Sequence, residues 1–87
     1  MNGLQCRIAR AGMGWSATDL ANKAGMGYAT VIRFENGSDI TRKTRNSLAQ
    51  VFKDAGVEFF ILRGHLGVIV PEPAKSPKQK KGEVAID

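Results

Sequence analysis

The sequence has few of the residues from which disulfides, metal centres and membrane spans are built. Its 87 residues include one cysteine, Cys6, and one histidine, His65, so the chain cannot close an internal disulfide or assemble a Cys/His metal site. It has neither a run of about eighteen apolar residues nor the basic-then-apolar start of a signal peptide. We therefore expect a cytoplasmic protein that crosses no membrane and needs no metal or other cofactor.

Catalytic groups are also scarce, whereas positive charge is abundant. Neither His65 nor Cys6 has an acid or nucleophile at a recognisable spacing, so the sequence predicts no enzyme activity.

Thirteen Lys and Arg residues oppose eight Asp and Glu residues, for a net charge of +5. Nine of the basic and five of the acidic residues lie in residues 1–70. This basic balance suits a polyanion such as nucleic acid, or a membrane surface.

The composition changes twice along the chain and divides it into three segments. Residues 1–56 carry closely spaced helix start and stop signals, and residues 57–70 hold two β-branched and aromatic runs around a Gly-bearing turn. Residues 71–87 contain all three prolines and no aromatic residue. The pattern predicts a helical domain, a β-hairpin with strands at about 57–62 and 67–70, and a disordered Lys/Pro-rich tail. Because a lone hairpin is marginal in water, we expect it to pack on the helices or to form a dimer contact.

Four helices are expected in the first segment, at about 3–11, 17–24, 28–36 and 42–55. Capping boxes begin the first two helices. The glycines at which the four helices would stop are Gly12, Gly25, Gly37 and Gly56. The apolar residues at helical spacing in the first helix are Leu4, Ile8 and Ala11. Only two residues separate Gly25 from the third helix, an arrangement typical of a helix-turn-helix.

Two motifs in this region resemble a known family. They are SATDLANKAGM at residues 16–26 and ATVIRFENG at residues 29–37. Their Leu-Ala pair, turn glycine, Thr-apolar pair and Glu-Asn-Gly ending are similar in spacing to the lambda-repressor-like, Cro-type (XRE-like) helix-turn-helix transcriptional regulators. The resemblance covers roughly residues 4–55. It implies a mostly α-helical DNA-binding domain of four helices, with the hairpin in place of the family's fifth helix, and a structural ion pair between Arg10 and Glu35.

Helical geometry divides the third helix into a buried and an exposed side. The residues expected at the contact between the second and third helices are Leu20, Ala21, Met26, Val31 and Phe34. With Val31 pointing inward, a rotation of 100° per residue turns the opposite side outward. The candidates for reading DNA bases on and beside that outward side are Tyr28, Ala29, Thr30, Ile32 and Arg33.

The chemistry of these candidates suits different bases. Arg33 fits a bidentate contact with guanine, whereas Ala29, Thr30 and Ile32 fit thymine methyl groups. Each has an alternative role. Ile32 could pack against the second helix or a partner, Arg33 could be a solvated charge or a phosphate contact, and Tyr28 could cap the turn or contact a phosphate.

Phosphate contacts are expected on both sides of the third helix. Ser16 and the free N–H groups at the start of the second helix offer an anion site. Basic and hydroxyl side chains also follow the Asn36-Gly37 turn. The phosphate candidates are Ser16, Asn36, Thr41, Arg42, Lys43 and Arg45. The alternative for the last four is a basic turn that is merely solvated.

These observations predict a sequence-specific DNA-binding transcriptional regulator from a bacterium or phage, associated with the nucleoid. We expect it to bind double-stranded DNA as a homodimer and to repress by occupying a promoter. The alternative is an antitoxin or antiactivator that acts through a protein partner. Binding to DNA falls steeply with salt, whereas binding to an apolar protein surface does not, so salt dependence separates the two.

Overall fold

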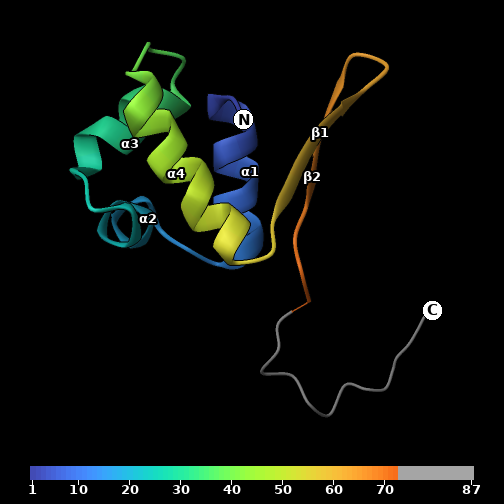
Figure 1. Cartoon of the computed structure of the whole chain (residues 1–87), viewed down its shortest axis with the longest axis horizontal. Helices are drawn as coiled ribbons and strands as arrows, with labels where there is room; N and C mark the ends of the chain where they lie inside the picture. The colour runs from blue at the N-terminus through green and yellow to red at the C-terminus, as the bar shows by residue number, and fades with distance from the viewer. Residues whose placement is uncertain (73–87) are drawn as a thin grey trace.

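The computed structural model describes residues 1–72, and the tail predicted to be disordered, residues 71–87, lies almost entirely outside the described residues. Four helices come first: α1 (Gly3–Met13), α2 (Ala17–Ala24), α3 (Tyr28–Glu35) and α4 (Arg42–Asp54). A hairpin of β1 (Glu58–Leu62) and β2 (His65–Ile69) follows. This confirms the predicted mostly α-helical fold with a C-terminal antiparallel hairpin (Figure 1).

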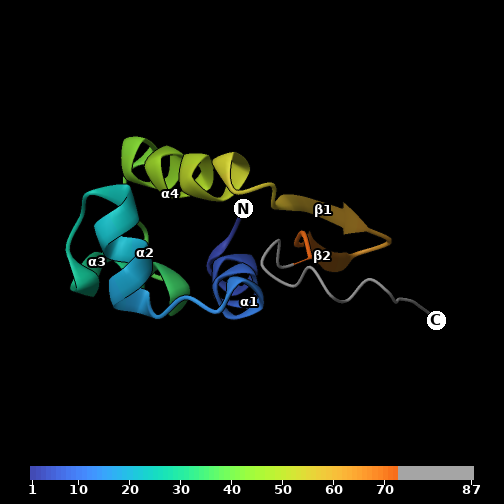
Figure 2. The same ribbon diagram turned by 90° about the horizontal axis from the view of Figure 1, so that it is seen from below.

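The elements are arranged with α1 and α4 in the middle of the molecule. The helices α2 and α3 lie on one side of this pair, and the hairpin lies on the other (Figures 1 and 2). The strand β2 runs beside α1, with which it makes most of the hairpin's contacts to the helices. The helix α3 and the hairpin are therefore at opposite ends of the fold and are free to serve different functions.

One hydrophobic core joins the helices to the base of the hairpin. Leu48 and Phe52 of α4 are completely buried. The Phe52 ring stacks on Trp15, with centroids 5.6 Å apart, and meets the edge of Phe59 of β1 at the same distance. Four of the five residues predicted between α2 and α3 are buried, namely Leu20, Ala21, Val31 and Phe34. Met26, just after the α2 cap, is only half-buried.

The predicted end of α1 is wrong. The helix ends at Gly14, which has a left-handed φ of 73°, and not at Gly12. Leu4 and Ile8 are 50% and 43% exposed, because α1 buries its side of small residues instead. At Gly3 a Cβ atom would collide with the carbonyl oxygen of Phe34, so α1 lies too close to α3 for a large side chain at this contact.

The second strand also begins earlier than predicted, at His65 in place of residue 67. Leu62 pairs with His65, so the turn contains only Arg63 and Gly64. Their φ angles are 53° and 79°, as a type I′ turn requires. The hairpin is tied to α1 by Gln5, whose Nε2 donates to the carbonyl oxygens of Phe60 and Gly67 at 3.1 and 3.2 Å. Within residues 1–72, no helix is long and apolar enough to span a bilayer.

Candidate nucleic-acid interface

An ion pair fixes the end of α3 against α1. The Glu35 side chain is only 2% exposed, and it accepts two hydrogen bonds from Arg10, from Nε and Nη2, each at 2.8 Å. Cys6 donates a weaker hydrogen bond from Sγ to Oε2 at 3.5 Å. The pair that the resemblance implied between Arg10 and Glu35 is thus present, and the fork of the guanidinium fits the carboxylate in the bidentate manner.

The charges of this cluster are stable at neutral pH. Burial acts to raise the pKa of Glu35, but the hydrogen bonds and charge of Arg10 outweigh it and hold that pKa below its usual range. Burial and the charge of Glu35 raise the pKa of the Cys6 thiol to about 12. Glu35 therefore stays ionised and Cys6 stays a protonated donor, which gives the cluster a structural role at the contact of α1 with α3.

Arg7 holds the C-terminal end of α3 against α1 by hydrogen bonds, a role that the sequence analysis missed. Its Nη2 donates to the carbonyl oxygen of Glu35 at 3.3 Å and to Oδ1 of Asn36 at 3.0 Å. The spacing of Arg7 and Arg10 was the available signal, because residues three apart share a helix face. The amide oxygen of Asn36 is consequently engaged, and only its amide N–H groups remain for a phosphate.

The surface of α3 away from this anchor faces solvent. Tyr28 is 55% exposed, Ala29 and Arg33 are exposed, and Thr30 is half-buried. Ile32 is half-buried and packs against the core, so it is less available to a base edge than Ala29 or Arg33. The candidates that remain most accessible are Tyr28, Ala29 and Arg33.

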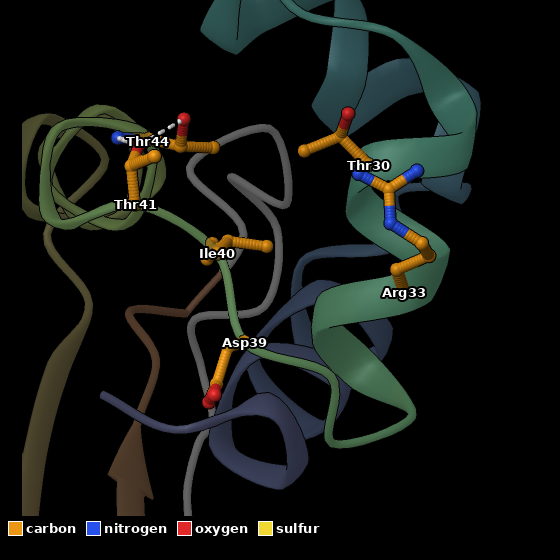
Figure 3. A pocket seen from close by; sticks show the side chains of 6 residues that line it. All are labelled: Thr30, Arg33, Asp39, Ile40, Thr41 and Thr44. Carbon is orange, nitrogen blue, oxygen red and sulfur yellow. Dashed lines mark hydrogen bonds between the residues drawn. The ribbon is translucent and has the colours of Figure 1, made fainter.

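A groove of about 410 Å³ separates α3 from the start of α4. Thr30 and Arg33 stand on the α3 side of this groove, Thr41 and Thr44 stand on the α4 side, and Asp39 and Ile40 connect the two (Figure 3). The Asp39 carboxylate points away from the Arg33 guanidinium (Figure 3). Within residues 1–72 Arg33 forms no ion pair, so its five N–H donors are available to a ligand. Sequence reasoning did not find the part that Asp39, Ile40 and Thr44 play here, because they join Thr30 and Arg33 only through the path of the loop.

The first turn of α4 concentrates positive charge beside the groove. Thr41 caps the helix, accepting from the Thr44 backbone N–H at 3.1 Å and donating to the Thr44 hydroxyl at 2.8 Å. Arg42, Lys43 and Arg45 are exposed, and the turn contains no acidic residue. Cations at a helix N-terminus oppose the helix dipole. A bound phosphate would therefore relieve an unfavourable local field.

The expected anion site at the start of α2 is already partly occupied by the protein's own carboxylate. Asp19 accepts from the Ser16 backbone N–H at 2.8 Å, and the Ser16 hydroxyl oxygen accepts from the Asp19 N–H at 3.0 Å. The hydrogen bond from the Ser16 backbone lowers the pKa of Asp19, so this side chain is a resident anion. Ser16 is left with its hydroxyl proton as a donor, which makes the start of α4 the stronger phosphate site.

Within residues 1–72, no three His, Cys, Asp or Glu side chains are grouped so that they could hold a metal ion. No family model matches the chain, and a search of curated proteins finds no relative. The candidate interface consists of the exposed side of α3, the groove beside it and the basic start of α4.

Proposed function

We propose that this chain is a sequence-specific DNA-binding transcriptional regulator of the lambda-repressor-like helix-turn-helix type, and that it represses by occupying a promoter. One observation carries the proposal. The helix α3 is anchored on its inner side by the buried Glu35 pair, and on its outer side it offers Arg33, which has no ion pair within residues 1–72, next to the basic start of α4. A rigid exposed helix beside a cluster of cations is what insertion into a major groove requires.

The proposed contacts divide by chemistry. An eight-residue helix is about 12 Å long at its 1.5 Å rise per residue, so a single major groove accommodates it. Arg33 would donate two hydrogen bonds to O6 and N7 of a guanine, and Ala29 would contact a thymine methyl group. Arg42, Lys43 and Arg45 would hold phosphates of the flanking backbone, which set the register of the helix without reading sequence.

The test is selection of bound sequences from random double-stranded DNA, followed by affinity measurements on the enriched site. Arg33→Ala should cost about 1–3 kcal/mol on that site and relax the preference at one base pair. Lys43→Ala should weaken all sequences about equally and lower the slope of log affinity against log salt by about 1. Lys53→Ala is the matched control, because Lys53 is an exposed cation in the last turn of α4, away from the proposed contact.

Two results would contradict the proposal. One is the absence of any enriched motif at low salt, and the other is an affinity for DNA that Arg33→Ala and Lys53→Ala reduce equally.

For a homodimer we expect a palindromic site whose half-sites lie about 34 Å apart, or a multiple of that distance.

A second candidate function has one observation in its favour. Several large apolar side chains of the hairpin are exposed, including Ile61 at 67% and Leu62 at 60%, and such side chains suit a protein partner. An antitoxin or antiactivator would use this surface to bind another protein. Its affinity for that partner would depend weakly on salt, whereas repressor binding to DNA would fall steeply.

A further inference from the structure

The strand register gives the hairpin two different faces. Side chains alternate across a pleated sheet, so directly paired residues lie on the same face. Phe59 pairs with Val68 and Ile61 with Leu66 on one face, which we call the inner face. The other, the outer face, consists of three further pairs: Glu58 with Ile69, Phe60 with Gly67, and Leu62 with His65.

Within residues 1–72, the helices cover the base of the inner face, whereas Ile61 of that face, near the turn, is 67% exposed. Phe59 and Val68 pack against the core of the helices. On the outer face Phe60 is 42% exposed, Leu62 60% and Ile69 52%. The Phe60 ring lies over Gly67, in the space that a side chain at position 67 would fill. The outer face therefore presents three large apolar side chains to solvent, one of them a ring spread across both strands.

We propose that the outer face packs against the outer face of a second copy of this chain, with the two hairpins antiparallel. The inference rests on the homodimer of the proposed function and names its interface. The base of each two-stranded sheet would then be covered on both sides, by its own helices and by the partner's hairpin, as stable layered folds require. Two sheets packed in this way lie about 10 Å apart.

The charges on the hairpin select the antiparallel arrangement. Glu58 stands at the open end of the outer face, while Arg63 stands in the turn at the other end, and both are exposed. In the antiparallel arrangement Glu58 of each copy lies over the turn of the other, so the favourable pairing with Arg63 occurs twice. In the parallel arrangement the two Glu58 carboxylates would face each other, and like charges in an interface are unfavourable.

The area of the face sets the strength of the dimer. A large aromatic side chain has about 200 Å² of surface, so three half-exposed apolar side chains supply roughly 300 Å² per copy. A standard stable interface buries about 800 Å² per partner. We therefore expect a reversible dimer with a Kd in the micromolar range or weaker, which DNA carrying two half-sites would reinforce.

The outer face suits a second copy better than an unrelated partner because it is self-complementary. It carries an acidic end and a basic end on either side of an apolar centre, and a two-fold axis through that centre matches each end with its opposite. The same axis would place the two α3 helices symmetrically, since α3 lies at the end of the fold opposite the hairpin (Figures 1 and 2).

The test is sedimentation equilibrium of the full chain without DNA, from about 5 µM to about 1 mM, a range that brackets the expected Kd. Leu62→Asp places a charge on the outer face and should weaken association at least tenfold. Ile61→Asp is the matched control, because Ile61 is the adjacent residue, is 67% exposed and lies on the inner face. It should leave association within about twofold of the unsubstituted chain. Circular dichroism verifies that both variants remain folded.

Charge exchange tests the orientation. Glu58→Lys and Arg63→Glu should each weaken the dimer, and the double variant should restore it, because only the antiparallel arrangement brings these two positions together. A chain that stays monomeric throughout, equal effects of Leu62→Asp and Ile61→Asp, or no restoration by the double variant would overturn the inference. A dimer that binds no DNA would instead overturn the proposed function and leave the interface intact.

Discussion

Replacing Glu35 with glutamine should destabilise the fold by about 2–3 kcal/mol, which is the value expected for losing charge-assisted hydrogen bonds from a mostly buried pair. The substitution keeps the size of the side chain but removes the charge that balances Arg10. The Arg10 side chain is 20% exposed, so water compensates part of the loss and the cost stays below the roughly 3–5 kcal/mol of a fully buried pair.

The assay is urea unfolding, followed by circular dichroism and by the fluorescence of Trp15, which stacks on the core residue Phe52. For a domain of this size the expected loss corresponds to a fall in Tm of about 10–20 °C. Asp39→Asn serves as the control, because Asp39 is an exposed carboxylate in the loop between α3 and α4. It should change the free energy of unfolding by less than about 0.5 kcal/mol.

A second comparison separates charge balance from packing. The double variant Arg10→Met with Glu35→Leu replaces the pair with apolar side chains and should cost less than Glu35→Gln alone, since the one charge that loses its partner is that of Arg7, 3.7 Å from Glu35 and 51% exposed. Two outcomes would refute this prediction. One is a free energy of unfolding for Glu35→Gln that equals that of the control, and the other is a double variant that is less stable than Glu35→Gln. DNA affinity of these variants is informative only below their unfolding temperatures.

Three further predictions follow from the same contacts. The lowered pKa of Glu35 contributes stability that is present above its ordinary value of 4.5 and is lost as the pH falls through the lowered pKa, so acid titration should destabilise the unsubstituted chain more than Glu35→Gln in that range. Gly3→Ala should cost about 1–3 kcal/mol, because its Cβ meets the Phe34 carbonyl oxygen. Gly27→Ala should cost less than about 1 kcal/mol in urea unfolding, because a Cβ there has nothing within 4 Å and only the weaker N-cap preference of alanine for α3 opposes it. Cys6, completely buried and with a pKa raised to about 12, should react with iodoacetamide at pH 8 only as fast as the chain unfolds; fast alkylation of the folded chain would contradict this.

The local signals in the sequence predicted most of the elements. The capping boxes at Asn2 and Ser16 and the Thr41 cap start their helices as expected. These features depend on hydrogen bonds between residues three apart, so a few neighbouring residues contain all the information. The second helix, Ala17–Ala24, agrees with its predicted bounds of 17–24 for this reason.

The errors arose where a choice depended on distant residues. Gly12 and Gly14 are both able to end α1, and the apolar spacing of Leu4 and Ile8 is as regular as a core face. The close approach of α1 to α3 at Gly3 decided that the side with small residues is buried instead. Likewise, the second strand begins at His65 and not at residue 67, because Leu62 pairs with His65 across a turn of only two residues.

The candidate site divides in the same way. The sequence by itself determined which face of α3 carries Arg33 and where the cations of α4 cluster, because helix periodicity and composition are local properties. Only the tertiary structure decided that Arg7 holds the end of α3, that Ile32 packs inward, and that a groove joins Arg33 to Thr41. Each of these depends on the distance between groups that the chain brings together only when it folds.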